Sequence, residues 1–427
     1  MARNRQGRAG GRLARGFCFL LLALSPLPAA AQAPAQAPAD AEWRAFSRRY
    51  VAPGGRIIDT ANQGISHSEG QGYGMFFAVY FNDRAAFERI WGWTQRTLSR
   101  RQDALFSWRY DPRSSFPVSD PNNATDGDIF IAWALLMASE RWDVPDYRAA
   151  AARVATAILN CCTVEVGNRL VLLPGISGFQ RAEGIVVNLS YYAFPALRAL
   201  SRVVPDRRWA RLERDGLELI REAAFGQPQL PPDWLLLGRS DERPAIAPGW
   251  PPRFSWDAVR VPLNLAWQRV DAPTLSAANR FWANPENPHR PPAWIDLRSG
   301  QMPPYAGHAG TRAVHALTRA RLGEASGRPL RVADAPDYFG AALVLQARIA
   351  ETMPPEPPAL EPPEASPPPP QNRWFTELGR AVLTRIRRED REDPNPVTEA
   401  RWSRPDFLEP SQVRGVPSGL RGLVPPR

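Results

Sequence analysis

Three acidic residues stand where predicted helices begin. Glu69, Asp126 and Asp257 each lie at the start of an apolar stretch with helical periodicity, beside glycine, aromatic or proline residues. A carboxyl group can give or take a proton in a hydrolytic reaction. If the helices close into a ring with these ends on one rim, the three carboxyl groups meet in one cleft, as acid and base catalysis requires.

Each acid also has a structural explanation. Ser66 and Glu69 have the spacing of a capping box, which predicts Glu69 in the first turn of a helix. Asp126 suits an N-cap or a first turn, where the helix dipole favours an acid. Arg260 follows Asp257 at i+3 and can pair with it. On spacing alone, capping is the favoured interpretation of Glu69.

Gly70, Gly72 and Gly74 form a Gly-x-Gly-x-Gly pattern in the same stretch. A dinucleotide site needs a preceding buried strand and a third glycine one place later, where this chain has Met75. Glu69 would also repel a pyrophosphate. The pattern therefore does not predict nucleotide binding.

Fifteen tryptophans accompany these acids. Tryptophan has a large apolar area, so core packing accounts for many of them. A groove with carboxylates and flat indole faces also suits sugar rings, whose axial C–H groups stack on aromatic rings. Both interpretations stay open at this point.

The composition excludes several classes of chemistry. The chain contains no lysine, so all 53 basic residues are arginine, which excludes a phosphate-binding P-loop and Schiff-base catalysis. Of four histidines only His308 and His315 lie close together, with no carboxylate at ligand spacing. We therefore expect no metal and no cofactor. A Gly-x-Ser-x-Gly nucleophile motif is also absent from the sequence.

Residues 1–31 have the pattern of an export signal: five arginines, an apolar stretch from Phe17 to Leu24, and small residues ending at Ala31. The apolar stretch is too short for a membrane anchor, so we expect a periplasmic or secreted protein with no membrane insertion after cleavage. The five arginines supply half of the formal net charge of +10. The remaining arginines are interleaved with acids, which gives no case for a nucleic-acid partner.

Residues 43–353 have helical periodicity throughout, after a flexible segment at 32–42. About eleven stretches with apolar residues at three-four spacing are separated by Pro, Gly and Asn clusters. Short connections predict antiparallel helical hairpins in one all-α domain. The periodicity alone does not separate a closed barrel from an open solenoid. The stretches are expected to begin near Trp43, Ser68, Arg84, Asp126, Asp146, Asn188, Asp206, Asp257, Pro273, Gly310 and Asp337.

The composition changes after Met353. Residues 354–370 contain ten prolines and are expected to form a semi-rigid extended linker. Residues 371–427 are rich in arginine, acids and proline and are expected to be largely disordered, either as a dispensable tail or as a docking peptide. Outside the signal, Cys161 and Cys162 are adjacent, so the fold is expected to stand without a disulfide framework.

The chain resembles glycoside hydrolase family 8 at these same residues. The resemblance covers about residues 43–352 and is most specific in its first two motifs. The matching stretches are Ile65 to Met75 (ISHSEGQGYGM), Ala124 to Asp128 (ATDGD), Ser190–Tyr191, and Trp256 to Leu263 (WDAVRVPL). The resemblance implies an (α/α)6 barrel and an inverting endo-β-1,4-glucanase.

The resemblance also implies roles for single residues. Glu69 matches the proton donor and Asp257 the base, while Asp126 matches a signature aspartate that we expect to hold and distort the sugar. Support for the same subsite is expected from Arg260 and Tyr191. Trp108 is a weaker stacking candidate, and the family pattern assigns nothing to the C-terminal tail.

The nearest resemblance is to the periplasmic members of the family that accompany bacterial cellulose synthase. It implies a β-1,4-glucan such as cellulose as substrate, a role in cellulose biosynthesis, and a cellulose synthase or export complex as a partner. We expect a monomer. The alternatives are a xylanase or chitosanase on the same scaffold, or a periplasmic glucan-binding protein without activity.

Overall fold

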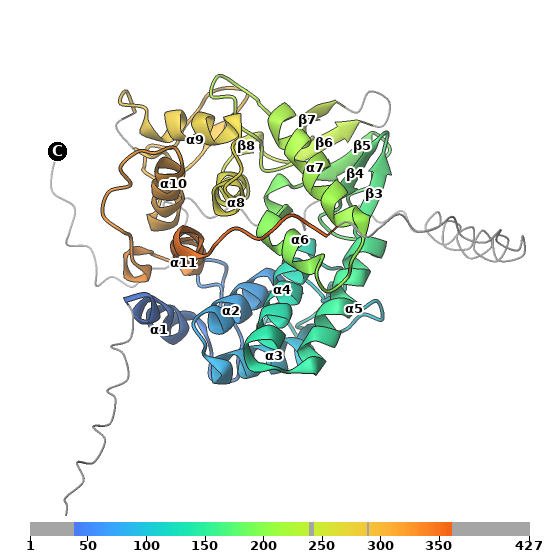
Figure 1. The fold of residues 1–427 in the computed structure, drawn as a ribbon. Helices are drawn as coiled ribbons and strands as arrows, with labels where there is room; N and C mark the ends of the chain where they lie inside the picture. Colours follow the sequence, from blue (N-terminus) through green and yellow to red (C-terminus); the bar gives the residue numbers. More distant parts are fainter. Residues whose placement is uncertain (1–37, 239–242, 288–289, 361–427) are drawn as a thin grey trace, which may run out of the picture. The chain divides into compact units, whose positions relative to one another are not determined.

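The computed structural model describes residues 38–238, 243–287 and 290–360. The predicted signal peptide, the C-terminal tail and all but the beginning of the proline-rich segment lie outside these residues. Within the described part, Figure 1 shows helices packed around one another, with most of the strands gathered near one end of helix α7.

The described residues form eleven α-helices, which confirms the predicted all-α class. Most begin within two residues of the predicted starts, because the three-four spacing of apolar residues marks the side of each helix that packs inward. The helices are α1 (Pro38–Tyr50), α2 (Ser68–Tyr80), α3 (Arg84–Leu98), α4 (Thr125–Trp142), α5 (Pro145–Cys161), α6 (Phe194–Leu200), α7 (Arg207–Glu222), α8 (Arg260–Gln268), α9 (Pro273–Ala283), α10 (Ala309–Arg321) and α11 (Tyr338–Thr352).

Inner and outer helices alternate along the chain. Helices α2, α4, α6 and α8 are buried along almost their whole length, whereas α3, α5, α7 and α9 bury one face. Successive inner helices pack together, from α2 through α4 and α6 to α8, and α8 packs on α10 and α11. Helix α1 contacts both α11 and α2. This alternation is the (α/α)6 arrangement that the family resemblance implies.

The two ends of the inner helices carry different groups of polar side chains. Side chains from the first turns of α2, α4 and α8 contact one another, so these helices begin at the same end of the array. At the other end, Arg321 donates hydrogen bonds to the carbonyl oxygens of Ala266 in α8 and Ala350 in α11, over 2.9 and 2.7 Å. The acids predicted at helix beginnings therefore share one end.

Short strands, which the sequence analysis did not predict, connect the helices. They form four small antiparallel sheets among the described residues. Two of these lie beside the acids, because β1 directly precedes α2 and β8 precedes the turn that carries Asp257. The paired strands are β1 (Ser66–His67) with β2 (Arg109–Tyr110), β3 (Thr163–Val166) with β4 (Arg169–Leu172), β6 (Leu235–Gly238) with both β5 (Gly184–Val187) and β7 (Pro244–Ile246), and β8 (Arg253–Phe254) with β9 (Ile295–Asp296). The 3-10 helices are η1 (Leu189–Tyr191) and η2 (Val332–Asp334).

Residues 354–360, here called the strap, run across the end opposite the acids. The Glu356 carboxylate pairs with Arg202, and its carbonyl accepts hydrogen bonds from Arg198 and Gln268, each over 2.8 Å. The Leu360 N–H donates to the hydroxyl of Ser201 over 3.0 Å. The beginning of the proline-rich segment is therefore bound to the ends of α6 and α8.

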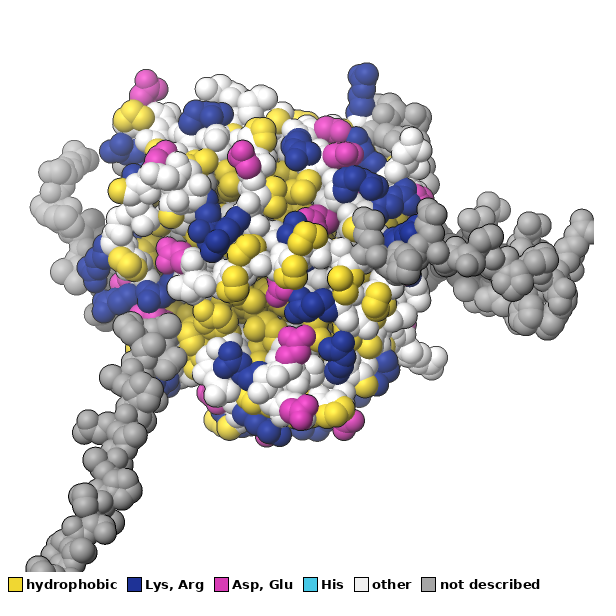
Figure 2. Space-filling model, in the orientation of Figure 1, with side chains coloured by type: hydrophobic (Ala, Val, Ile, Leu, Met, Phe, Trp, Pro, Cys, Tyr) yellow, Lys and Arg dark blue, Asp and Glu magenta, His cyan; other side chains and the backbone are white. Residues whose placement is uncertain are grey.

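Charged side chains are mixed on the surface that faces the viewer. Figure 2, in the same orientation as Figure 1, shows arginines interspersed with aspartates and glutamates on this face. Among the described helices, none has both the length and the apolar character that crossing a bilayer demands.

Candidate active site

His67 fixes the beginning of α2 and thereby places Glu69. The backbone N–H of Gly70 donates to Nδ1 of His67 over 3.0 Å, so His67 is the N-cap. The predicted capping box is wrong, because the Ser66 hydroxyl donates instead to the carbonyl of Ile57. Glu69 nevertheless lies in the first turn of the helix, as predicted, with its side chain buried.

Glycines bring the beginnings of α2 and α4 into direct contact. A Cβ on Gly72 would lie 2.8 Å from the Cβ of Phe130, and a Cβ on Gly127 would lie 2.6 Å from the backbone nitrogen of Glu69. Both distances are too short for a side chain, so only glycine fits without movement. The Gly-x-Gly-x-Gly pattern therefore serves helix packing, and it sets Glu69 beside the first turn of α4.

Asp126 lies in that first turn and is buried. Its Oδ1 accepts a hydrogen bond from the N–H of Gly127 over 2.8 Å, while its Oδ2 lies 3.3 Å from Nη1 of Arg260. One oxygen is thus held by the helix and the other faces the neighbouring cation. This is the first-turn position predicted from the sequence.

Asp257 lies in a turn before α8, because the helix begins at Arg260, three residues later than predicted. Arg260 is the first residue of the helix, and its Nη2 donates to Oδ1 of Asp257 over 2.6 Å, which confirms the predicted i,i+3 pair. The N–H of Arg260 also donates to the Asp257 carbonyl over 3.0 Å. The turn and the ion pair together direct the Asp257 side chain toward the other acids.

Arg260 joins all three acids. Its Nη1 contacts Glu69 as well as Asp126, and it donates to the hydroxyl of Tyr73 over 3.0 Å. Burial by itself lowers the pKa of Arg260, but the charges of Glu69 and the other acidic neighbours outweigh burial and hold that pKa above its ordinary value. A permanent cation therefore offsets part of the repulsion among three close carboxylates.

Tyr191 lies at the end of η1, with its ring centroid 5.8 Å from the guanidinium carbon of Arg260. Burial raises the pKa of Tyr191 well above its usual value, and the charges of Asp126 and Asp257 raise it further. The phenol therefore keeps its proton and can donate a hydrogen bond in the site.

One pocket brings these residues together. It is open to solvent and takes in about 600 Å³ of space outside the protein atoms, part of which is open solvent. All three predicted catalytic acids line it, and so do Tyr191 and Trp108, whereas Arg260 lies beneath the carboxylates and is almost fully buried. The pocket is lined by Asp59, Asn62, Ile65, His67, Ser68, Glu69, Trp108, Ala124, Asp126, Tyr191, Trp234 and Asp257.

Trp108 is positioned by the strand pair beside α2. Its carbonyl accepts the N–H of Ser68 over 2.9 Å, and its indole N–H donates to Asp120 over 2.8 Å. The guanidinium carbon of Arg109 lies 5.9 Å from the ring centroid. The indole is thus held through its N–H and by a cation over its ring on the wall of the pocket.

Two side chains of this lining, Trp234 and Asp59, were not predicted from the sequence. Trp234 stacks between Phe179, at 5.8 Å and 3°, and Trp250, at 5.2 Å and 21°, and lines the pocket. Asp59 lies 3.4 Å from Nε2 of His67. Both Asp59 and Trp234 are on irregular segments, where helical periodicity carries no signal. The abundance of tryptophan was the one available indication for Trp234.

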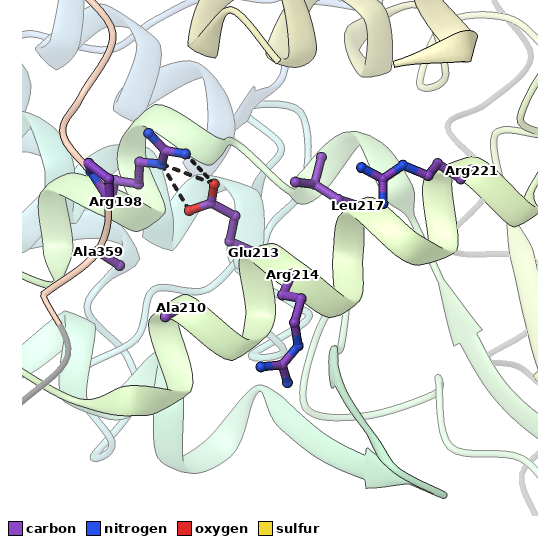
Figure 3. Close-up of a pocket in the computed structure, with 8 residues that line it drawn as sticks. Arg198, Ala210, Glu213, Arg214, Leu217, Arg221 and Ala359 are labelled. Atoms are coloured by element: carbon purple, nitrogen blue, oxygen red, sulfur yellow. Dashed lines mark hydrogen bonds and ion pairs between the residues drawn. The ribbon is translucent and has the colours of Figure 1, made fainter. Parts of the chain in front are cut away.

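A second depression among the described residues has a different lining. A depression between α7 and the strap is lined by Arg198, Glu213, Arg214 and Arg221 beside apolar side chains, and Figure 3 shows Glu213 bound to Arg198. It therefore has no pair of acids. Across the described ranges, no three His, Cys, Asp or Glu side chains are grouped as ligands for a metal ion.

Comparison with known proteins gives a consistent result. The family profile described as "Glycosyl hydrolases family 8" matches residues 15–353. A "Probable endoglucanase" of Novacetimonas hansenii is 43% identical over 310 residues, covering 72% of this chain and 90% of that protein. An "Endoglucanase" of Cellulomonas uda is 40% identical over 287 residues, covering 67% and 78% respectively.

Solved structures are similar in fold as well. The structure of the endo-beta-1,4-glucanase CMCax from Acetobacter xylinum superposes with a TM-score of 0.70 at 42% identity, covering 74% of this chain and 98% of that one. The chain thus spans nearly the full length of this solved relative.

Proposed function

The chain belongs to glycosyl hydrolases family 8, and from this premise we propose that it is an endo-β-1,4-glucanase that hydrolyses cellulose or a related β-1,4-glucan with inversion. The observation that supports this most directly is the convergence of Glu69, Asp126 and Asp257 on one open pocket. On its walls, the indole of Trp108 offers a flat apolar face for a sugar ring, and Trp234, which stacks on Phe179 and Trp250, adds an aromatic edge.

Glu69 and Asp257 are the two residues proposed to transfer protons in the reaction. In an inverting reaction one carboxylic acid protonates the leaving oxygen while a carboxylate removes a proton from water on the opposite face of the sugar. Glu69 is the proposed acid and Asp257 the proposed base. They contact different terminal nitrogens of Arg260, so one cation orients both side chains.

Asp126 and Tyr191 are proposed to hold the sugar at the cleaved bond. Asp126 has one oxygen fixed by Gly127, and Tyr191 keeps a proton to donate. Hydrogen bonds that strengthen as the ring distorts contribute several kcal/mol to such reactions. Arg260 is too deeply buried to reach far into the pocket, so we assign it the orientation of the carboxylates.

The test is the release of reducing ends from soluble β-1,4-glucan. We expect the purified chain to cleave carboxymethyl cellulose and to lower its viscosity early, as internal cleavage does. Xylan and chitosan are assayed in parallel, and a higher kcat/KM on either one would replace the glucan as substrate. Binding to glucan without any product would contradict the enzymatic proposal and favour a glucan-binding protein.

The stereochemistry is tested separately. Inversion of a β-linkage releases the α-anomer first, which proton NMR detects before mutarotation. The carboxyl groups of an inverting pair lie about 6.5–9.5 Å apart in order to admit the water. Release of the β-anomer would contradict the assignment of Asp257 as base and would make it a nucleophile.

Export and association are proposals drawn from the sequence. The charge and apolar pattern of residues 1–31 supports secretion or a periplasmic location, and N-terminal sequencing of the exported protein would identify the cleavage site. A link to cellulose biosynthesis predicts co-purification with a cellulose synthase or export complex. Light scattering tests the proposed monomer.

A further inference from the structure

A second buried aspartate holds the turn that carries Asp257. Asp233 lies on the connection between α7 and β6, with an exposed fraction of 8%. Its Oδ1 accepts the N–H of Ser255 over 3.0 Å and the N–H of Ala258 over 2.8 Å. Its Oδ2 is hydrogen-bonded to the hydroxyl of Ser255. One carboxyl group thus ties together both ends of the turn that contains Asp257.

The anchoring segment is itself fixed by the backbone. The N–H of Asp233 donates to the carbonyl of Arg253 over 2.7 Å, on the strand that leads into the turn. The neighbouring carbonyl of Trp234 accepts the N–H of Ala247 over 3.0 Å, and its indole is stacked between two other rings. Backbone hydrogen bonds and ring stacking therefore hold the segment that carries Asp233 in place.

We propose that Asp233 is a positioning residue that fixes the 255–258 turn and so aims the carboxylate of Asp257 at the attacking water. The inference rests on the proposed function, because it assumes that Asp257 acts as the base. Asp233 itself does not line the pocket. We therefore assign its effect on the reaction to the position of the turn.

The electrostatic surroundings agree with a role that does not depend on charge. Burial raises the pKa of Asp233 to about 7, and the neighbouring charge of Asp257 raises it as well. Near neutral pH a large share of the molecules therefore holds a neutral carboxyl group at this position. Such a group still accepts two N–H bonds at Oδ1 and can donate to Ser255 from Oδ2.

This chemistry makes asparagine a close substitute. In Asp233→Asn the amide oxygen can accept from Ser255 and Ala258, and the amide nitrogen can donate to the Ser255 hydroxyl. In Asp233→Ala all three bonds are lost and two buried N–H groups have no partner. A displacement of a catalytic group by about 1 Å can cost about 100-fold in rate.

The experiment compares these variants on carboxymethyl cellulose. We expect Asp233→Ala to lower kcat by about 100-fold with KM changed by less than about threefold, and Asp233→Asn to restore kcat to within about fivefold of wild type. Ser255→Ala removes only the Oδ2 contact and is expected to lower kcat by about threefold. Ser255→Ala tests the contact with Asp233 even if Asp233→Ala does not fold.

Asp215 supplies a matched control. It is another buried aspartate that accepts a backbone N–H, from Leu170 over 2.8 Å, but it lies on α7 outside the pocket. Asp215→Ala is expected to lower the melting temperature while kcat stays unchanged.

The outcomes separate the two proposals. A wild-type chain that cleaves no β-1,4-glucan contradicts the proposed function. An active wild type with an equally active, folded Asp233→Ala overturns only the positioning role. The role is also overturned if Asp233→Asn loses as much kcat as Asp233→Ala, since the hydrogen bonds would then not be what matters.

Discussion

Arg260 holds Asp257 by a hydrogen bond of 2.6 Å from Nη2, and the other terminal nitrogen of the same guanidinium holds Glu69. The two residues proposed as base and acid, 188 positions apart in the chain, therefore share one cation. Any change to that cation must disturb both of them at once. This makes Arg260 the most informative single position in the site.

Arg260→Lys is expected to lower kcat by about 100-fold or more, because an ammonium group cannot make the forked contacts of a guanidinium. Steady-state kinetics on carboxymethyl cellulose measures the loss. The control is Arg321→Lys, which removes a fork that bridges α8 and α11 at the far end of the array and should leave kcat unchanged. Equal kcat in wild type and Arg260→Lys would remove Arg260 from the proposed mechanism.

Glu69→Gln and Asp257→Asn are expected to abolish nearly all hydrolysis while the chain still folds. Each keeps the shape of the side chain but removes the proton donor or the base, and general acid-base catalysis contributes about 10²–10⁴-fold. Reducing-end release gives the activity and circular dichroism gives the fold. Asp206→Asn, at the N-cap of α7, is the control for replacing an acid by its amide. Substantial activity in either site variant would refute the role of that residue.

Gly127→Ala is expected to reduce both stability and kcat. The added methyl group would overlap the Ser68 hydroxyl and the backbone of Glu69, so α2 must move away from α4. Overpacking of this kind costs about 1–3 kcal/mol. The same shift displaces Glu69 from its partners, which a structural defect far from the site would not do.

Gly54→Ala is the matched control for that substitution, because a Cβ there meets nothing within 4 Å. Thermal unfolding and steady-state kinetics of both variants test whether Gly127→Ala lowers stability and kcat. If Gly127→Ala unfolds and reacts like wild type, then close approach of the two helices is not what places Glu69.

The sequence predicted the helices well and the irregular segments poorly. Apolar residues at three-four spacing marked where α3, α7 and α9 begin, because each of these helices has one face in the core. The strands were not predicted because each is four residues or shorter and has no long alternating pattern. The spacing predicted Ser66 as the cap, bound to the N–H of Glu69, whereas His67 is the N-cap and accepts the N–H of Gly70.

The residues of the candidate site also differ in how far the sequence predicts them. Glu69, Asp126 and Asp257 were found because they lie in or just before the first turn of a helix and match a family motif. Asp233 and Trp234 contact the same turn or pocket from a connection between a helix and a strand, so their position depends on tertiary folding. No local pattern in a single sequence marks such residues.

Asp128 is expected to make stability depend on pH. It is fully buried, accepts hydrogen bonds from the Phe106 N–H and the Asn123 amide, and burial raises its pKa to about 7. Between about pH 4 and pH 7 the folded state keeps a proton that the unfolded chain loses, so stability falls as pH rises through this window. Above about pH 7 the contribution is constant.

Asp128→Asn removes that proton and with it this part of the pH dependence. The melting temperature of wild type relative to Asp128→Asn should therefore decrease from pH 4.5 to pH 7.5, whatever the cost of the amide itself. Differential scanning calorimetry at several pH values measures the difference. A difference that stays constant, or that grows with pH, would show that Asp128 does not hold its proton in the folded state.

Glu356→Ala is expected to destabilise the domain without affecting catalysis. Its carboxylate pairs with Arg202 at the end of α6, and hydrogen bonds between charged groups contribute about 1.5–3 kcal/mol when largely buried. The strap lies at the end of the inner helices opposite the pocket, so kcat on carboxymethyl cellulose should stay within about twofold of wild type, a difference of less than about 0.5 kcal/mol.

The matched control is Glu351→Ala, an exposed acid in the last turn of α11, for which we expect the free energy of unfolding to change by less than about 0.5 kcal/mol. Equal melting temperatures for the two variants would mean that the strap is not anchored through Glu356, and a loss of kcat in Glu356→Ala would mean that the two ends of the array are coupled.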